Sequence, residues 1–245
     1  MKELLAELDR CAETGRRVTF WLRDDDAVAV TADLERLLEL AGQWSIPLVL
    51  AVIPMPAEPE LAVRLAEFDR VRVATHGFAH RNHAPPGERK QELGAHRPAA
   101  TVLDEIRLGR ERLDALLPGK TIPMLVPPWN RIAAQFVPHL PNLGFRWLST
   151  FGQDPPSCPV PDLEQIDCQL DIIDWRARAS HPHELLAARV ASLVRQRAPV
   201  SAPIGILSHH LANDEAAWAF LADLFRLTMH HEAATWAWPD PGFAE

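Results

Sequence analysis

The sequence predicts an α/β fold in which parallel strands alternate with helices. Short apolar or β-branched runs alternate along the chain with longer amphipathic segments, which is the pattern of strands joined by crossover helices. Such a chain forms either an open sheet or a closed barrel. Several of the runs end in unusual polar residues, and the carboxyl ends of the strands of a β/α barrel converge on one face. We therefore expect a barrel.

Each expected element follows from its local pattern of apolar residues. Strands are expected at residues 18–22, 47–53, 71–75, 122–126, 145–150, 166–173 and 204–208. Helices are expected at residues 31–44, 59–68, 99–117, 132–140, 182–197 and 214–230. Thr31 and Asn213 stand where N-caps of the helices that follow them are expected.

Composition limits the class of protein. The chain has 245 residues, of which 47% are hydrophobic and 24% charged, so it can bury a full core. No Gly/Ser-rich or charge-run linker interrupts it, and a single domain over residues 1–245 is expected. The formal net charge of −8 argues against nucleic acid or an anionic membrane surface as the main partner. The sequence does not indicate an oligomeric state.

Cysteine usage and the first residues bear on localisation. Cys11, Cys158 and Cys168 are an odd number without a C-x-x-C pair, which argues against a disulfide scaffold or a cysteine zinc site. Residues 1–10 carry acids where a signal peptide would need an apolar core, and no run of about eighteen apolar residues occurs. We expect a cytoplasmic protein that does not insert into a membrane.

Two polar segments at strand ends indicate a metal site. Asp24, Asp25 and Asp26 follow the first expected strand, and adjacent carboxylates repel unless a metal ion or a shared proton makes the site useful. His76 and His80 follow the third expected strand at a spacing of i,i+4, which would bring them to one side of a helical turn. The alternatives are a solvated or N-capping acidic loop and a chance pair of histidines. The order of these residues at strand ends favours the metal.

Three further strand ends carry candidate residues. Pro127-Pro128-Trp129-Asn130 follows the fourth expected strand, Asp174-Trp175 the sixth, and His209-His210 the seventh. Asp174 could equally cap a turn and Trp175 could fill the core, and one of two neighbouring histidines in a strand normally points elsewhere. The polar segment at residues 82–97 is either a mobile lid or a loop.

These segments resemble the motifs of polysaccharide deacetylases with a NodB-homology domain, the family 4 carbohydrate esterases, over roughly residues 18–238. The family motif T-F-D-D-G is similar to residues 23–27, with Ala27 at the glycine position. This register implies that Asp25 is the catalytic base and Asp26 a metal ligand, although a register one residue earlier stays open. The motif H-S/T-x-x-H is matched by residues 76–80, with Gly77 in place of the hydroxyl residue.

The remaining motifs are matched in part. The motif R-x-P-Y-G resembles residues 126–130: Trp129 falls where the backbone N–H forms the oxyanion hole, and Pro128 falls at a substrate-contacting position. The arginine that steadies the base is missing, and Arg23 or Arg131 could replace it. The fourth motif resembles Asp174 with Trp175, which the resemblance makes a substrate contact. The fifth, L-x-H, resembles residues 207–209 and favours His209 over His210.

The resemblance implies a distorted seven-stranded β/α barrel that holds one divalent metal ion through Asp26, His76 and His80. Zinc is the default, and cobalt, nickel, manganese or iron(II) fit the same ligands. The implied reaction is removal of an N-acetyl group from an amino sugar or a short or linked glycan, by a metal-activated water. The alternatives are hydrolysis of another C–N amide, such as a cyclic imide or ureide, and a carbohydrate-binding relic without turnover.

The resemblance also distributes the proton transfers. Asp25 takes a proton from the attacking water, and the N–H of Trp129 stabilises the oxyanion. His209, oriented and kept cationic by Asp174, donates a proton to the leaving amine. Four tryptophans offer flat faces on which a sugar ring could stack, namely Trp129, Trp147, Trp175 and Trp236.

Overall fold

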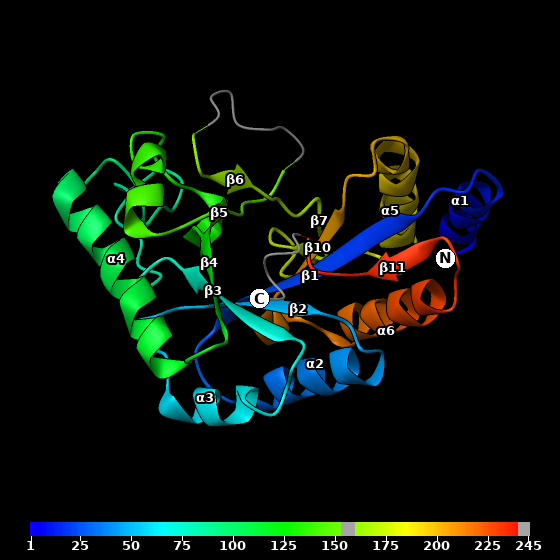
Figure 1. Ribbon diagram of the computed structural model, residues 1–245, viewed down its shortest axis with the longest axis horizontal. Coiled ribbons are helices and arrows are strands. Elements are labelled where there is room, and N and C mark those ends of the chain that lie inside the picture. Colours follow the sequence, from blue (N-terminus) through cyan, green and yellow to red (C-terminus); the bar gives the residue numbers. More distant parts are fainter. Residues whose placement is uncertain (153–159, 240–245) are drawn as a thin grey trace. The chain divides into compact units, whose positions relative to one another are not determined.

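The computed structural model describes residues 1–152 and 160–239, which form an α/β fold around a mostly parallel sheet (Figure 1). The strand order is β6-β5-β4-β3-β2-β1-β10-β7, with β11 beside β1. The strands of this sheet are β1 (Val18–Ala27), β2 (Leu48–Val52), β3 (Val71–His76), β4 (Thr121–Val126), β5 (Trp147–Leu148), β6 (Glu164–Gln165), β7 (Leu170–Asp171), β10 (Ile204–Ser208) and β11 (Ala234–Trp236). The antiparallel pair β8 (Ile173–Asp174) and β9 (Ala179–Ser180) forms a separate hairpin.

The described residues form six α-helices. They are α1 (Lys2–Glu13), α2 (Ala32–Gln43), α3 (Pro59–Leu65), α4 (Ala99–Leu116), α5 (His183–Arg197) and α6 (Glu215–Met229). The expected N-cap at Thr31 is confirmed, because its hydroxyl accepts the N–H of Leu34 at 3.1 Å. No helix of the described residues combines the length and the apolar composition of a membrane span.

The chain divides into two compact units. Unit 1 comprises Met1–Asp24, Thr31–Leu48 and Cys168–Glu245, and unit 2 comprises Asp25–Val30 and Val49–Asp167. The boundary falls inside β1, between Asp24 and Asp25, so the acidic run contributes to both units. A single domain over the whole chain stays a prediction.

Unit 1 is organised around the first part of β1. This part pairs in parallel with β10, from Phe20 opposite Ile204 to Asp24 opposite Ser208, and β10 pairs in parallel with β7. Helix α5 packs on β10 and β7, and α1 packs on α5. These pairings set Asp24 beside the end of β10.

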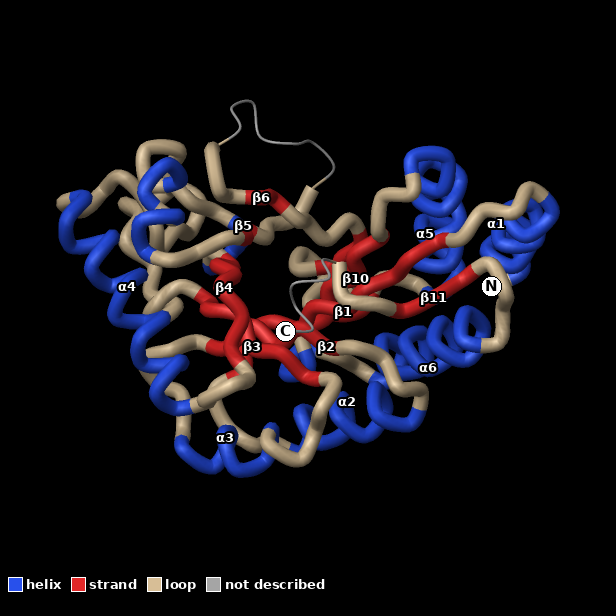
Figure 2. Tube along the Cα trace, viewed as in Figure 1, coloured by secondary structure: helices blue, strands red, loops and turns tan. Residues whose placement is uncertain are grey.

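Unit 2 contains the parallel pairs β3·β4, β4·β5 and β5·β6. Figure 2 shows α4 running along the outside of β3 and β4, and α4 contacts β3. The apolar side of α4 and the buried faces of β4 and β5 close over one core cluster: Leu93, Val102, Ile106, Leu125, Phe136, Leu140, Phe145 and Leu148. This core holds the carboxyl ends of β3 and β4 in place.

The expected helix over residues 132–140 is wrong. The segment forms the 3₁₀ turns Val137–His139 and Pro141–Leu143 instead. Pro138 and Pro141 lack the N–H that an α-helix needs, and a proline ring clashes with the preceding turn. Phe136 and Leu140 are nevertheless buried in the core. The apolar spacing therefore predicted which residues pack in the core, but it did not indicate an α-helix.

Other elements differ from expectation at their ends. β1 extends to Ala27, so the acids lie inside the strand rather than after it. The expected strand at residues 166–173 is replaced by β7 with short strands on either side. Asn213 is not the N-cap of α6; Asp214 is, because its carboxylate accepts the N–H of Ala217 at 2.9 Å. Helix α1 and strands β6, β9 and β11 were not expected.

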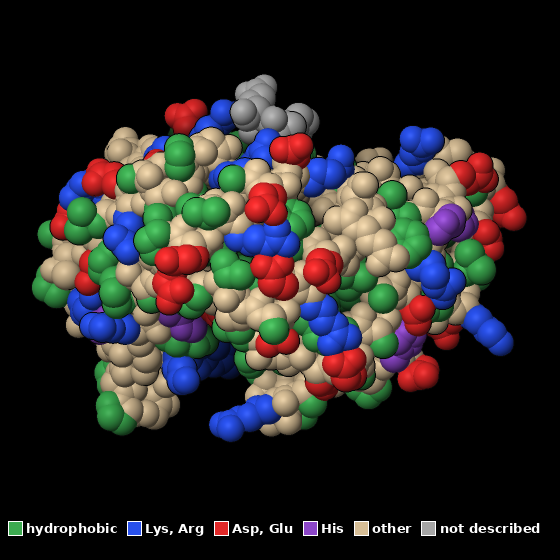
Figure 3. All heavy atoms as spheres, turned by 90° about the horizontal axis from the view of Figure 1, so that it is seen from below, with side chains coloured by type: hydrophobic (Ala, Val, Ile, Leu, Met, Phe, Trp, Pro, Cys, Tyr) green, Lys and Arg blue, Asp and Glu red, His purple; other side chains and the backbone are tan. Residues whose placement is uncertain are grey.

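Two further expectations from composition concerned the cysteines, which were not expected to form a disulfide scaffold, and the surface charges. Cys11 and Cys168 are buried and form no disulfide within the described residues, and Cys158 lies outside those residues. On the face shown in Figure 3, acidic and basic side chains are interspersed rather than gathered by sign.

Candidate metal centre

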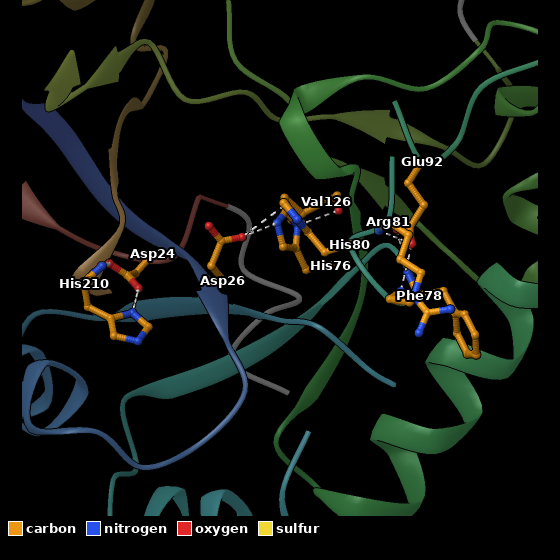
Figure 4. A network of polar contacts seen from close by, with 10 residues as sticks. Asp24, Asp26, His76, Phe78, His80, Arg81, Glu92, Val126 and His210 are labelled. Carbon is orange, nitrogen blue, oxygen red and sulfur yellow. Dashed lines mark hydrogen bonds and ion pairs between the residues drawn. The ribbon is translucent and has the colours of Figure 1, made fainter. Parts of the chain in front are cut away.

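Unit 2 brings the three expected metal ligands together. The Asp26 carboxylate oxygen Oδ1 lies 3.1 Å from Nε2 of His76 and 3.3 Å from Nε2 of His80 (Figure 4). One ligand atom from each residue lies within 4.8 Å of the others. The side chain of His76 is buried, whereas those of Asp26 and His80 are 29% and 23% exposed. The cluster is therefore anchored on one side and accessible on another.

The orientation of His76 is set by the neighbouring strand. Nδ1 of His76 lies 2.9 Å from the carbonyl oxygen of Val126, at the end of β4. When Nδ1 donates its proton to that carbonyl, Nε2 of the neutral ring directs its lone pair toward Asp26. A second hydrogen bond of this kind fixes the tautomer of metal-ligating histidines.

The electrostatics of the cluster favour a bound cation. Burial by itself would lower the pKa of His76, but the hydrogen bond to Asp26 and the charges of Asp25 and Asp26 outweigh burial and raise that pKa. The pKa of His80 is lowered, by burial first and then by His76, against the opposing charges of Asp26 and Glu92. Two carboxylates that attract a proton to this point attract a metal ion in the same way.

The loop after β3 joins the histidines in an unexpected manner. The prediction that a helical turn aligns them is wrong, because His76 is the last residue of β3 and His80 lies in a loop. Gly77 and His80 have left-handed backbone angles, with φ of 59° and 53°. The chain reverses between them, and the ring centroids come to 5.1 Å. Asp26 is also left-handed, at φ 75°, a conformation that aspartate adopts more readily than most residues.

Sequence reasoning missed one residue of this site, Glu92. Its side-chain carboxylate accepts the N–H groups of Phe78, Ala79 and Arg81 at 2.9–3.1 Å, within the loop that carries His80. Glu92 belongs to the polar segment at residues 82–97, which was expected to be a lid or a loop. No motif singled it out, because the contact joins residues more than ten positions apart.

Comparison with known proteins identifies the fold. No protein-family model matches the chain, and no curated protein matches it significantly. Solved structures do match. A structure described as T48 deacetylase with substrate is 16% identical, with a TM-score of 0.59, covering 94% of this chain and 92% of that chain. A family 4 carbohydrate esterase from Streptomyces lividans in complex with acetate is 13% identical, with a TM-score of 0.60, covering 93% and 95%.

A third structure contains a metal ion. A family 4 acetyl xylan esterase from Clostridium thermocellum in complex with a cobalt ion is 14% identical, with a TM-score of 0.57, covering 89% of this chain and 87% of that chain. This chain has the fold of the family 4 carbohydrate esterases. The predicted fold class is confirmed, and the sequence motifs can be placed on that fold.

The segment that resembles the third esterase motif lies beside the histidines. Trp129, at φ 55° in the 3₁₀ turn Pro128–Asn130, has its ring centroid 4.3 Å from that of His80. Pro128 is buried against Gly77, because a Cβ built on Gly77 would lie 2.5 Å from Cγ of Pro128. The structure thus brings Pro128 and Trp129 to the metal cluster, while their roles toward a substrate stay predictions.

The two arginines proposed to replace the missing family arginine differ. Arg131 donates from Nη1 to the carbonyl oxygen of Lys90 at 2.8 Å, so it ties two loops together. Arg23 is fully buried and stands two residues before Asp25 in β1. Replacement of the missing arginine by Arg23 or Arg131 stays a prediction.

Asp24 does not belong to the metal cluster. In unit 1, its carboxylate accepts the hydroxyl of Ser208 at 2.6 Å and the backbone N–H of His210 at 2.9 Å, and its Oδ1 lies 2.5 Å from Nδ1 of His210 (Figure 4). Both oxygens are engaged. This arrangement uses Asp24 and His210 outside the metal cluster. The roles of Asp25 as base, Asp26 as ligand and His209 as acid stay predictions.

The two residues that resemble the fourth motif, Asp174 and Trp175, lie in the β8–β9 hairpin, and Trp175 contacts His209. Trp175 is 52% exposed, and its indole meets the imidazole of His209 edge-on, with centroids 4.6 Å apart. Asp174 accepts the N–H groups of Arg176 and Ala177, which lower the pKa of its carboxyl. Asp174 therefore caps the β8–β9 turn, and its effect on His209 stays a prediction.

Only part of the expected tryptophan set can face a ligand. Trp147 and Trp236 are core residues, at 2% and 5% exposure. Trp175 is exposed and Trp129 is half-buried. The stacking hypothesis is therefore retained for Trp129 and Trp175 alone.

Proposed function

We propose that this chain is a metal-dependent hydrolase that removes an acetyl group from an amino sugar or a short glycan. The observation that carries the proposal is the accessible Asp26, His76 and His80 cluster on a carbohydrate-esterase fold. Of the similar structures, one is a family 4 carbohydrate esterase in complex with acetate and another is described as an acetyl xylan esterase.

The donor set fits a divalent metal. Ligand atoms bound tetrahedrally to zinc at 2.0–2.1 Å lie about 3.3 Å from one another. The Asp26 oxygen lies 3.1 Å and 3.3 Å from the two imidazole nitrogens. Two imidazoles and one carboxylate also suit cobalt, nickel, manganese and iron(II). Asp26, His76 and His80 would hold the ion, and the bound ion would supply Lewis acidity to water and to the substrate carbonyl.

The residues of the chain would supply the remaining steps. Asp25, buried beside Asp26 in β1, would accept the proton of the attacking water. The backbone N–H of Trp129 would donate to the oxyanion, a contribution of roughly 3–4 kcal/mol for one such donor. His209 would donate a proton to the leaving amine, which is a poor leaving group until it is protonated.

Two alternatives make different predictions. Opening of a cyclic imide or ureide would use the same ligands and base on a smaller substrate. A carbohydrate-binding relic would lack turnover, but the complete ligand set argues against it. A cytoplasmic location and the choice of a soluble substrate over a polymer stay predictions from the sequence.

The test combines metal analysis with a screen for acetate release. The purified protein, loaded with zinc or cobalt, would be offered N-acetylglucosamine compounds, short N-acetylated oligosaccharides, O-acetylated xylan and cyclic ureides or imides. We expect acetate from the N-acetyl compounds, and none from the His80→Ala variant. Acetate only from xylan would identify an O-acetyl esterase, and hydrolysis only of a cyclic ureide or imide would contradict the deacetylase proposal.

A further inference from the structure

Glu92 is a buried carboxylate whose partners are all backbone groups of one turn. Its side chain is 1% exposed. Oε2 accepts the N–H of Phe78 at 3.0 Å, and Oε1 accepts the N–H groups of Ala79 at 2.9 Å and Arg81 at 3.1 Å. Figure 4 shows Glu92 beside Phe78 and Arg81. Hydrogen bonds from neutral amides to an ionised carboxylate are among the stronger ones in proteins.

The turn that Glu92 holds is the one that presents His80. Phe78, Ala79 and Arg81 flank His80 on both sides, and His80 itself has a left-handed φ of 53°. Such a conformation persists in a residue other than glycine only where the surroundings hold it. Three amide donors fixed to one carboxylate supply that constraint.

Gly77 and Glu92 are sterically matched. Gly77 has a φ of 59°, and a Cβ built on it would lie 2.1 Å from Oε2 of Glu92. No side chain fits there while the carboxylate is in place. The structure therefore explains why glycine stands between the two histidines, where the related motif has a hydroxyl residue: the carboxylate of Glu92 occupies that space from a different part of the chain.

Glu92 is itself held firmly on its far side. The next residue, Leu93, is part of the core cluster beneath α4. Arg97 donates from Nη2 to the backbone carbonyl of Glu92 at 3.2 Å and from Nη1 to Glu105 of α4 at 2.8 Å. The carboxylate is therefore linked to α4 and the core.

We infer that Glu92 is a positioning residue of the metal centre, which fixes the Phe78–Arg81 turn so that His80 faces Asp26 and His76. This inference rests on the proposed metal centre. It predicts that the metal-free protein already holds the three ligands in place, so that little of the binding free energy is spent on ordering the turn. Groups that orient metal ligands typically change metal affinity by 10–100-fold when removed.

The test compares Glu92→Ala and Glu92→Gln with the matched control Glu105→Gln. Glu105→Gln loosens the Arg97 link on the far side but leaves the three amides of the turn bonded. Co²⁺ would be titrated into each metal-free protein and followed by its visible absorption. Amide hydrogen exchange at Phe78, Ala79 and Arg81 would be measured before metal is added. Circular dichroism would establish that each variant is folded.

We expect Glu92→Ala to weaken Co²⁺ binding by about 10–100-fold and to speed exchange of the three amides. Glu92→Gln keeps one acceptor oxygen, so it should fall between Glu92→Ala and the wild type, and Glu105→Gln should match the wild type. Saturating Co²⁺ should restore activity to Glu92→Ala, since the base and the acid are unchanged. Wild-type affinity in folded Glu92→Ala or Glu92→Gln, or unchanged exchange at the three amides, would overturn the inference alone. Failure of the wild type to bind Co²⁺ would overturn the proposed metal centre, and the inference with it.

Discussion

Two carboxylate–histidine clusters built from one acidic run have opposite characters. Asp24 meets His210 and Ser208 in unit 1, where the side chains of Asp24 and His210 are 0% and 1% exposed. Asp26 meets His76 and His80 in unit 2, where Asp26 and His80 are partly exposed. The residue types are the same. The first cluster is closed and the second is open.

The difference lies in how the carboxylate oxygens are satisfied. The Asp24 carboxylate accepts the hydroxyl of Ser208 and the backbone N–H of His210, and it also contacts Nδ1 of His210. Its lone pairs are therefore used inside the protein. In the open cluster, one Asp26 oxygen faces the Nε2 atoms of His76 and His80. All three atoms can direct lone pairs at one shared point. The closed pair uses its hydrogen-bonding capacity within the fold, whereas the open set has capacity for a cation.

The largest expected effect is loss of the open cluster. His80→Ala removes one of the three ligands and should abolish metal binding and activity, with little change in the free energy of unfolding of the metal-free protein. Metal content would be measured on the purified protein, with His83→Ala as a control in the same loop. Full metal occupancy in His80→Ala would contradict the ligand assignment.

Asp25→Asn should separate the base from the ligand. Because a general base acts on water and not on the ion, the variant should retain metal while its turnover falls by about 10²–10⁴-fold. Asp26→Asn is the matched comparison and should lose metal. The assignment would shift by one residue if Asp24→Asn lost turnover with metal retained and Asp25→Asn lost metal.

Asp24→Asn should affect stability rather than chemistry. Removing one partner of a buried hydrogen bond leaves the other unsatisfied and typically costs about 1–3 kcal/mol, and more where a charged group is involved. We expect a fall of this size in the free energy of unfolding, with metal content unchanged. Denaturant unfolding of Asp24→Asn, His210→Gln and the double variant would measure the coupling. Additive effects would show that the two side chains act independently.

The smallest expected effect concerns acid sensitivity at the N-cap of α6. Asp214 caps α6, and although partial burial alone would raise the pKa of its carboxyl, the N–H groups of Ser180 and Ala217 hold that pKa below its ordinary value. A lowered folded-state pKa gives stability that is present above the unfolded pKa of about 3.9 and is lost as pH falls through the folded value.

Asp214→Ala should therefore cost about 1 kcal/mol at pH 7. Asp214→Asn keeps the capping oxygen but loses the charge, so it should cost less and show a weaker loss of stability in acid. Denaturant unfolding at pH 7 and pH 3 would measure both variants. If Asp214→Asn lost as much unfolding free energy between pH 7 and pH 3 as the wild type, a group other than this cap would cause the acid sensitivity. The Asp24–His210 pair would then be tested first.

The sequence by itself determined the α/β class, most strands and the three candidate metal ligands. β10 has the expected bounds, and β2, β3 and β4 lie within one or two residues of theirs, because buried parallel strands are continuous apolar runs with sharp polar ends. Asp26, His76 and His80 were identifiable because each stands at or near such an end. The spacing of residues predicts structure wherever those residues belong to a single helix or strand.

The tertiary structure alone decided what joins distant parts of the chain. It divided the acidic run between the two units, engaged His210 with Asp24, and set Glu92 against the turn of His80. It also replaced an expected helix by proline-containing turns while keeping Phe136 and Leu140 in the core. Contacts between distant residues depend on how the strands pair and how the core packs. Local periodicity in the sequence contains no information about either.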